Sequence, residues 1–481
     1  MTAKSANKKS ENDQAAVAVA VSAPQNAPTT SHTLTVEGLG GKRLLEGSIP
    51  VYGAKNAVLK AMAAAALFSK ELHIDNVPPT DDVAKMADIL KAAGFAVTKR
   101  HTDDPGRDML TIEVPSPDAV LTDIDSKLAR SMRASVVLTG PMLARFGRVA
   151  FPAPGGCVIG ARPVDLFIEA YEKLGATVRI EADPASNATG ASDTRYVIEA
   201  PEGGLRGAEI FFPIQTVGGT ETLMMTAILA NGTTTLKNCA MEPEIQSLAH
   251  FLVKAGADIK GIGTTALIIK GRGPHEPLAT THRYVTMPDR IETGSFAALA
   301  VLCGREVTVT HCNPLDLESP LDALQRMGAH IERGADWLKI SSHSGAAAPM
   351  LLPLNIRTHE YPGFPTDLQS IFLTLMTAAT GQSMIFETIY EGRFRLAEEL
   401  IKMGARITIM NPREIMVHGP TMLSTPGEDD VVRAHDLRAG FAVLMAAVAA
   451  SGTTVIENVE HIYRGYARIA ERLAGIGVRI K

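Results

Sequence analysis

Aromatic residues are scarce in this chain of 481 residues: only 5% are Phe, Trp or Tyr, although 46% are hydrophobic. Its cores must therefore be built from aliphatic side chains, and its length is sufficient for two or more domains with a full core each. Positive charge is not in excess either, since the formal net charge is −5. This balance argues against a general affinity for nucleic acid.

Cysteine is also rare, and the four cysteines are too few and too scattered for a disulfide framework or for zinc-ligand spacing. We therefore expect no metal site and a reducing, cytoplasmic location. Long hydrophobic runs are lacking too, because the run Ala15–Val21 is far too short to span a bilayer. Residues 1–32, rich in Ala, Ser, Asn and Thr, are expected to form a disordered tail. No membrane association is expected, and the oligomeric state is left open.

What the chain does contain is internal repetition. A glycine that follows a helical pattern and precedes a short strand-like pair recurs six times, at intervals of 81, 81, 72, 76 and 73 residues, as Gly94, Gly175, Gly256, Gly328, Gly404 and Gly477. Each unit also has an earlier segment that is apolar all round, and such a helix must be buried on every side. These segments are Ala57–Phe68, Ala134–Phe146, Glu221–Ala230, Gly294–Cys303, Leu368–Thr380 and Leu437–Ala450.

The repeat predicts the order buried helix, strand, amphipathic helix, strand, strand, with sheets outside and the apolar helices within. Six units divide naturally into two groups of three. We therefore predict an α/β (α+β) fold with two lobes, one formed by residues 55–287 and the other by residues 33–54 together with 288–481. In that arrangement the first strand, around Leu34–Val36, completes the last group.

Polar residues stand at the starts of the predicted buried helices. They are Lys55 and Asn56, Arg133, Thr216 to Gly219, Arg290 and Glu292, Asp367, and Asp436 with Arg438. Unpaired N–H groups and the helix dipole make each such end an anion receptor, so convergence of the ends would create a cationic site. The alternative is that these residues only cap helices. Thr366 to Gln369 has the pattern of a capping box, in which Asp367 would be a cap rather than a base. Arg133 and Arg438, each taken alone, would be surface charges.

The most distinctive segment, PGGCVIGARPVDL at residues 154–166, places Cys157 in a glycine-rich loop ahead of a helix. Pro163 suits the first helical position, where its missing N–H costs nothing. Arg162 and the helix N-terminus would both lower the pKa of the Cys157 thiol and make it reactive. The alternative is a buried structural cysteine on an ordinary turn.

Together with six further motifs, this segment resembles the UDP-N-acetylglucosamine 1-carboxyvinyltransferase family of enolpyruvyl transferases. The motifs are GAKNA at 53–57, MRAS at 132–135, PDRIETG at 288–294, FPTDLQ at 364–369, DLRA at 436–439 and YRGY at 463–466. The resemblance extends from about Leu34 to Lys481 and implies two domains of three units, each an inside-out α/β barrel, with the active site between them. It also implies transfer of the enolpyruvyl group of phosphoenolpyruvate to the 3′-hydroxyl of UDP-N-acetylglucosamine. The family uses no cofactor or metal, and this step commits the sugar nucleotide to peptidoglycan synthesis.

The resemblance further implies roles for particular residues. Cys157 would protonate the methylene carbon of phosphoenolpyruvate, and Asp367 would accept the proton of the sugar hydroxyl. The cations around phosphoenolpyruvate would be Lys55, Arg162 and Arg464, with Asn56 beside Lys55. The positions expected to contact the nucleotide sugar are Arg133, Arg162, Pro163, Val164, Asp165, Leu166, Thr216, Val217, Gly218, Ile389, Arg393, Asp436 and Arg438.

Three departures from the family pattern lie on the nucleotide side. Val137 stands where many relatives carry an aromatic residue, Ile214 where many carry a lysine, and Phe167 where a histidine is usual. A paralogue that acts on another nucleotide or nucleotide sugar is therefore an alternative, as is a sensor that binds without turnover. A shikimate-pathway synthase is disfavoured because it lacks the cysteine loop. An RNA 3′-phosphate cyclase is disfavoured by the negative net charge.

Overall fold

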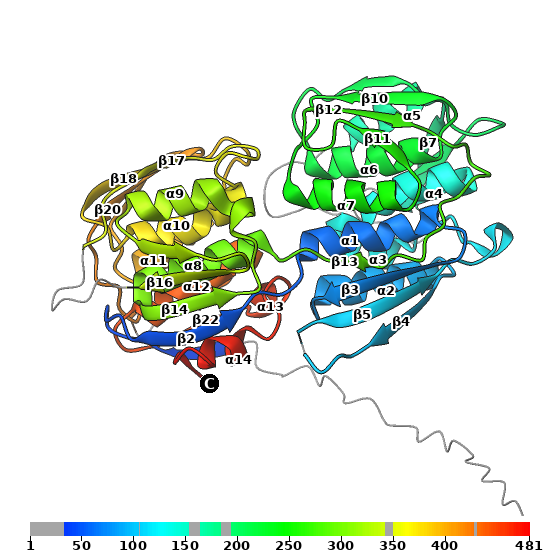
Figure 1. Ribbon diagram of the computed structural model, residues 1–481. Helices are drawn as coiled ribbons and strands as arrows, with labels where there is room; N and C mark the ends of the chain where they lie inside the picture. The colour runs from blue at the N-terminus through cyan, green and yellow to red at the C-terminus, as the bar shows by residue number, and fades with distance from the viewer. Residues whose placement is uncertain (1–32, 105, 153–163, 184–193, 342–349, 428–430) are drawn as a thin grey trace, which may run out of the picture.

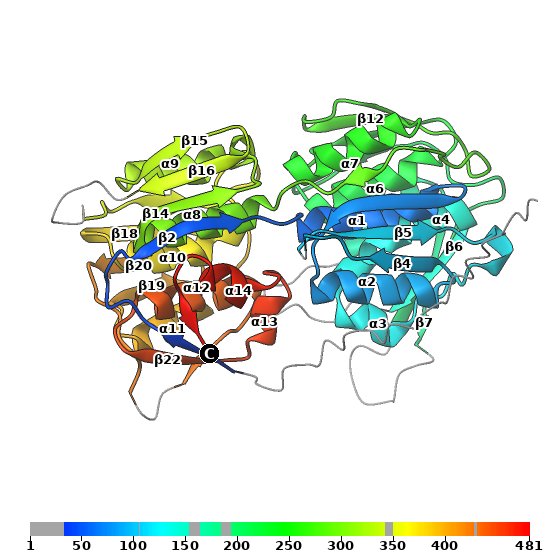
Figure 2. The same ribbon diagram turned by 60° about the horizontal axis from the view of Figure 1, so that its bottom comes forward.

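The computed structural model describes residues 33–481 except residue 105 and the segments 153–163, 184–193, 342–349 and 428–430. It shows two lobes side by side, each with helices in its centre and sheets around them (Figure 1, Figure 2). One core extends from Val58 to Tyr284, and we call this the first lobe. The other combines Leu34–Val51 with Ile291–Val478, and we call this the second lobe. The expected tail at residues 1–32 lies outside the described residues.

The first lobe has three units with the predicted order of elements. The first comprises α1 (Lys55–Ala64), β3 (Glu71–Val77), α2 (Asp81–Ala92), β4 (Ala96–Arg100) and β5 (Asp108–Glu113). The second comprises α4 (Thr139–Phe146), β6 (Arg148–Pro152), α5 (Asp165–Lys173), β7 (Thr177–Ala182) and β8 (Thr194–Glu199). The third comprises α6 (Val217–Ile228), β10 (Thr233–Lys237), α7 (Pro243–Lys254), β11 (Asp258–Lys260) and β12 (Ala266–Lys270). Between the first two lie α3 (Ser126–Ser131) and the 3₁₀ helix η3 (Arg133–Leu138).

The second lobe repeats the pattern. Its first unit comprises α8 (Arg290–Cys303), β14 (Gly304–Thr310), α9 (Glu318–Arg326), β15 (His330–Arg333) and β16 (Trp337–Ser341). The 3₁₀ turn η5 (Thr366–Leu368) leads into α10 (Gln369–Met376), β18 (Gly381–Phe386), α11 (Arg395–Lys402), β19 (Ile407–Asn411) and β20 (Glu414–Gly419). The last unit has α12 (Leu437–Ala449), β22 (Thr453–Glu457), α13 (Glu460–Tyr463), α14 (Ile469–Ala474) and β23 (Arg479–Ile480).

The last unit lacks its third strand, and the start of the chain supplies it. β1 (Thr33–Glu37) lies between β22 and β23 and is antiparallel to both. Both ends of the described chain therefore belong to one sheet, and the sixth unit cannot form without residues from the first forty.

Five of the six sheets contain a further strand that the repeat did not predict. It is parallel to the first strand of its unit in each case, as β2 (Leu45–Pro50), β9 (Glu209–Phe211), β13 (Tyr284–Val285), β17 (Asn355–Arg357) and β21 (Val432–Arg433). Four of these strands have only two or three residues, which is too short for a hydrophobic period to be visible in the sequence.

The six repeat glycines are explained by the backbone that ends each amphipathic helix. Their φ angles all lie between 93° and 102°, a range that side chains with a Cβ rarely adopt. After α2, for example, the N–H of Gly94 bonds to Lys91 O and that of Phe95 to Leu90 O. These hydrogen bonds satisfy the last carbonyl groups of the helix. The repeated glycine therefore marks the C-terminus of each amphipathic helix.

The central helices are buried as predicted. In α12 every residue from Arg438 to Ala449 is buried, and α6 is buried from Gly219 to Ile228. Among the described residues, none of the helices has the length and apolar character needed to cross a membrane.

The chain crosses between the lobes twice, and the two crossings bond to each other. Ala54 N donates to Met287 O over 2.7 Å, and Asp289 N donates to Tyr52 O over 2.9 Å. Glu292 accepts from the main-chain N–H of Tyr52 at 2.9 Å and from Nη2 of Arg472 at 2.5 Å. The junction is thus braced by buried polar groups, and α1 and α8 both begin directly beside it.

Candidate active site

Two of the expected phosphoenolpyruvate cations meet on one carboxylate. Lys55 is the first residue of α1, and its Nζ lies 2.9 Å from Oδ2 of Asp82. Arg464 follows α13 in the second lobe, and its Nε lies 3.1 Å from Oδ1 of the same residue. Asp82 is buried in the first turn of α2. A group from each lobe therefore contributes to one cationic cluster at the junction.

The electrostatics of this cluster follow from burial and mutual charge. Burial lowers the pKa of Lys55 below its ordinary value, and it outweighs the opposing effect of Asp82. Burial would raise the pKa of Asp82, but Lys55 and Arg464 together hold it below its usual range. Asp82 is thus a carboxylate at neutral pH, and it holds the side chains of Lys55 and Arg464 together.

The proposed base, Asp367, is held between two arginines. Arg393 donates from Nη2 to Oδ1 at 3.0 Å, while Arg438 donates to Oδ2 from Nε at 3.2 Å and from Nη2 at 3.1 Å. Burial would raise the pKa of Asp367, but Arg438 and Arg393 hold it far below its ordinary value. The carboxylate is therefore ionised across the whole working range of pH.

For Asp367 and Arg438 the alternatives, a helix cap and a surface charge, were wrong. Thr366 and Gln369 form no capping box, because η5 has no side-chain cap and the Thr366 hydroxyl donates to Glu387 instead. Arg438 is no surface charge, since it is buried and its guanidinium also contacts Tyr466, with Nη1 3.5 Å from the phenol oxygen.

Three helix starts of the second lobe come together around Asp367. Asp436 caps α12 by accepting from the N–H groups of Arg438 and Ala439 at 2.7 and 3.0 Å. Asp289 caps α8 and lies close enough to Arg438 for their charges to interact. Arg438 also lowers the pKa of Lys55, so the Asp367 cluster and the Lys55 cluster are electrostatic neighbours.

The helix start of α6 lies beside that of α5 in the first lobe. Thr216 caps α6, its Oγ1 accepting from Gly219 N at 3.2 Å. A Cβ added to Gly219 would lie 2.4 Å from Cγ2 of Thr216 and 3.1 Å from Cδ2 of Leu166, so this contact needs glycine. Val217 and Gly218 are half-buried here. In α5, Val164 is buried at the cap position, Asp165 is exposed and Leu166 is half-buried.

The remaining expected residues fall into two groups. Asn56, Arg133 and Ile389 are half-buried, in the first turn of α1, at the start of η3 and after β18. Cys157, Arg162 and Pro163 lie outside the described residues.

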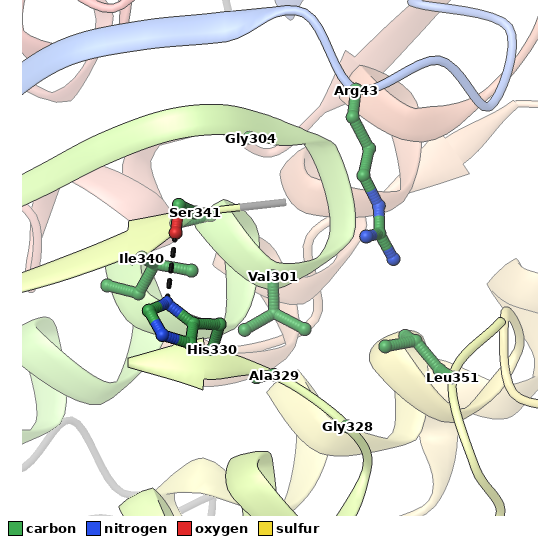
Figure 3. A pocket seen from close by; sticks show the side chains of 10 residues that line it. Arg43, Val301, Gly304, Gly328, Ala329, His330, Ile340, Ser341 and Leu351 are labelled. Carbon is green, nitrogen blue, oxygen red and sulfur yellow. Dashed lines mark hydrogen bonds between the residues drawn. The ribbon is translucent and has the colours of Figure 1, made fainter. Parts of the chain in front are cut away.

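Two hollows in the second lobe are unrelated to these clusters. One of about 10 Å³, room for a single water, is bounded by Arg43, Val301 and the hydrogen-bonded pair His330 and Ser341 (Figure 3). A larger one of about 180 Å³ shares Arg43 and Leu351 with it. Neither is lined by an expected site residue.

Known proteins match this chain over most of its length. The family model described as EPSP synthase (3-phosphoshikimate 1-carboxyvinyltransferase) matches residues 40–473. The UDP-N-acetylglucosamine 1-carboxyvinyltransferase of Rhodospirillum centenum is 40% identical over 440 residues, which cover 91% of this chain and 96% of that protein. The chain belongs to the enolpyruvyl transferase family. A relative with the same name from Acinetobacter baylyi is 37% identical over 92% of this chain and 98% of its own length.

Solved structures of other enolpyruvyl transferases share the fold. The enolpyruvyl transferase NikO from Streptomyces tendae has a TM-score of 0.77 and 25% identity, covering 93% of this chain and 98% of its own. EPSP synthase from Acinetobacter baumannii has a TM-score of 0.64 at 18% identity, covering 93% and 99%. The inside-out α/β architecture with two lobes is therefore that of the enolpyruvyl transferases.

Within this enolpyruvyl transferase, the three departures on the nucleotide side have different environments. Val137 is buried in η3, whereas Ile214 is 70% exposed just ahead of α6. Phe167 is half-buried, and its Cζ is 4.0 Å from the position of a Cβ on Gly218. An exposed isoleucine beside a helix N-terminus adds apolar surface where a lysine would add charge.

Two buried acids near these clusters, Asp82 and Glu387, cannot be recognised from the sequence. Asp82 has the appearance of an ordinary acidic residue in the first turn of a helix, and only its contacts with Lys55 and Arg464 reveal it. Glu387 follows a strand and has no charged neighbour in the sequence that would mark it.

Proposed function

We propose that this chain transfers the enolpyruvyl group of phosphoenolpyruvate to the 3′-hydroxyl of UDP-N-acetylglucosamine and releases phosphate, the step that commits this sugar nucleotide to peptidoglycan synthesis. Family membership and the name of the relatives that match over nine-tenths of the chain support this reaction. The observation that carries it is an ionised Asp367, held by Arg393 and Arg438, next to the cations Lys55 and Arg464 from the two lobes.

The reaction is an addition followed by an elimination. In the addition, Asp367 accepts the proton of the sugar hydroxyl, the hydroxyl oxygen bonds to C2 of phosphoenolpyruvate, and Cys157 delivers a proton to C3. In the elimination, C3 loses a proton, the C2–O bond to phosphate breaks and the double bond re-forms. Lys55 and Arg464 stabilise the charge on the phosphate as it leaves.

The ion pairs of Asp367 control how strong a base it is before and after the acceptor binds. Two arginines make it a weak base in the free protein, because they stabilise its charged form. The diphosphate of the sugar nucleotide offers the same guanidinium groups a competing anion. Each hydrogen bond that moves from Asp367 to the ligand raises the basicity of the carboxylate once the acceptor is bound.

The test is release of phosphate from phosphoenolpyruvate by the purified protein with a panel of acceptors. The panel contains UDP-N-acetylglucosamine, other nucleoside diphosphate sugars, free nucleotides and shikimate 3-phosphate. We expect the largest kcat/KM with UDP-N-acetylglucosamine. No release with any acceptor would contradict the proposal and favour a sensor.

A second candidate is the same chemistry on a different nucleotide acceptor. The exposed Ile214, in place of the lysine common in the family, is the observation that favours it. A larger kcat/KM with another member of the panel would establish this second function.

A further inference from the structure

The loop after β18 is organised by one buried carboxylate. Glu387 has no exposed surface, and its Oε1 accepts from the main-chain N–H groups of Ile389 at 2.8 Å and Tyr390 at 3.1 Å. The same oxygen accepts from the hydroxyl of Thr358 at 2.9 Å. Its Oε2 accepts from the hydroxyl of Thr366 at 2.9 Å. Four donors thus surround a charge that would be costly to bury without them.

The contact with Thr366 continues to the proposed base. Nη1 of Arg393 donates to Thr366 Oγ1 at 2.6 Å, and Nη2 of the same guanidinium donates to Oδ1 of Asp367 at 3.0 Å. A hydroxyl has a single proton. Because Thr366 gives that proton to Glu387, its lone pairs are left for Arg393. A guanidinium can only donate, so Arg393 donates both to Thr366 and to Asp367. Glu387 therefore fixes the orientation of the Thr366 hydroxyl that accepts from Arg393.

The side chain of Arg393 is also held in place by its burial and by Tyr390. It is buried, and its Cζ lies 5.7 Å from the ring centroid of Tyr390, a residue that Glu387 also holds through its main chain. Glu387 thereby reaches Arg393 from two sides, through the Thr366 hydroxyl and through the Tyr390 backbone.

We propose that Glu387 is a positioning residue for the acceptor site, which orients Arg393 and hence Asp367 through Thr366 and holds the main chain at Ile389. This inference rests on the proposed function. It assigns to the buried carboxylate a role in how the acceptor is bound, rather than in how phosphoenolpyruvate is held by the Lys55 cluster.

A merely structural role is the competing explanation, because Glu387 also braces the edge of a sheet. Thr358 accepts from Thr388 N at 2.8 Å, and its own carbonyl accepts from the Thr388 hydroxyl at 2.6 Å. Loss of that brace would lower stability without distinguishing between the two substrates. The two explanations therefore differ in whether KM changes for the acceptor alone.

The experiment compares Thr366→Val, Thr366→Ser and Thr374→Val. Valine has the shape of threonine without its hydroxyl, so Thr366→Val removes the link between Glu387 and Arg393. Thr374 is the matched control: it is a buried threonine of α10 whose hydroxyl bonds to Ala442 O in the helical core. Steady-state kinetics with both substrates, calorimetric titration with UDP-N-acetylglucosamine and thermal unfolding are measured for each variant.

We expect Thr366→Val to raise KM and Kd for UDP-N-acetylglucosamine by about 10- to 100-fold, with KM for phosphoenolpyruvate within about twofold. Thr366→Ser restores the hydroxyl and should return acceptor binding to within about threefold of the wild type. Thr374→Val should lower the unfolding temperature without moving either KM. Equal behaviour of Thr366→Val and Thr374→Val, or parallel changes in both KM values, would overturn the inference.

Glu387→Gln keeps the inference testable if Thr366→Val does not fold. An amide in place of the carboxylate would face one of the four donors with a donor of its own, and we expect the same rise in acceptor KM. A folded Glu387→Gln protein with wild-type acceptor KM would overturn the inference. Failure of the proposed function is distinct, since the wild type would then release no phosphate with UDP-N-acetylglucosamine; the comparison is then made with whichever acceptor the panel identifies.

Discussion

Nε of Arg464 lies 3.1 Å from Oδ1 of Asp82, so a cation of the second lobe is bonded to a carboxylate of the first. The other oxygen of that carboxylate binds Lys55 at 2.9 Å. Asp82 thereby holds in place two cations that would otherwise repel each other at the junction of the lobes.

Asp82→Asn should lower kcat/KM for phosphoenolpyruvate by about tenfold or more, because Lys55 and the half-buried Arg464 lose the counterion that positions them. Asp81→Asn is the matched control, an exposed aspartate in the same first turn of α2. Steady-state kinetics of both variants provide the measurement. A similar, small effect in both variants would contradict this role for Asp82.

The lowered pKa of Lys55 predicts a pH dependence with a definite sign. In the proposed mechanism Lys55 must be protonated to bind the phosphate, so kcat/KM for phosphoenolpyruvate should fall as pH rises through a value below the ordinary 10.5 of lysine. Lys55→Arg should move this fall to higher pH, because a guanidinium stays protonated. The exposed Lys91→Arg should leave the profile unchanged. A fall of kcat/KM at the same alkaline pH in Lys55→Arg would show that the titration of another group causes it.

Asp367→Asn should lower kcat by about 100- to 10,000-fold, the usual size of a general-base contribution. Arg438 and Arg393 keep the pKa of Asp367 far below its ordinary value in the free protein. A fall of kcat/KM at acid pH in the wild type should therefore not arise from protonation of Asp367. Single-turnover rates and a pH profile check both statements. Exposed Asp322→Asn serves as control. Retention of near-normal kcat in Asp367→Asn would remove it from the mechanism.

The buried pair Lys60 and Glu221 allows a test of stability apart from catalysis. Lys60 Nζ in α1 lies 3.1 Å from Glu221 Oε2 in α6, and both side chains are buried. At pH 8, where Glu221 is ionised, Glu221→Gln leaves a buried cation without a counterion and should lower the free energy of unfolding by about 3–5 kcal/mol. The double variant Lys60→Met/Glu221→Met removes both charges and should be close to neutral. A double variant as unstable as the single one would contradict this.

The same pair predicts how stability varies with pH. Burial raises the pKa of Glu221 to about 7 from 4.5, partly opposed by Lys60. Between these values the folded protein holds a proton that the unfolded chain releases, so the contribution of Glu221 to stability falls as pH rises through this window. Urea unfolding at pH 5 and pH 8 measures the slope, which should be smaller in the double variant. An unchanged slope would assign it to other groups.

The exposed Ile214 offers a test of the nucleotide side. Ile214→Lys places a cation next to the N-terminus of α6 and should lower KM for a nucleoside diphosphate sugar by about two- to fivefold at low salt, with less effect at high salt. Ile268→Lys, on the exposed face of β12, is the control. An equal effect of both substitutions, or none, would show that residue 214 does not face the ligand.

Much of the fold could be predicted because its repeat has a physical cause. Gly94 and its five equivalents occupy the left-handed position that ends an amphipathic helix, and apolar segments such as Leu437–Ala450 have no polar face to expose. The parallel fourth strand found in five of the six sheets could not be predicted, since β13 and β21, for example, have two residues each. Neighbouring strands, rather than sequence period, hold them in place.

The placement of candidate residues in the fold was predictable in the first turn of a buried helix, where Lys55 and Arg438 lie. It was not predictable where a contact joins distant segments. Asp82 and Arg464 are separated by 382 positions. Thr366 had the pattern of a cap, yet its hydroxyl is committed to Glu387 and Arg393. In each case tertiary contacts decide which of several local possibilities is realised.

The most direct test of the central claim is a mass spectrum of the product formed from UDP-N-acetylglucosamine and phosphoenolpyruvate by the purified protein. Our account predicts a sugar nucleotide heavier by one enolpyruvyl group, formed with one equivalent of phosphate and formed at least about 100-fold more slowly by Asp367→Asn. Phosphate release without that product, or equal amounts of it from Asp367→Asn, would contradict the account.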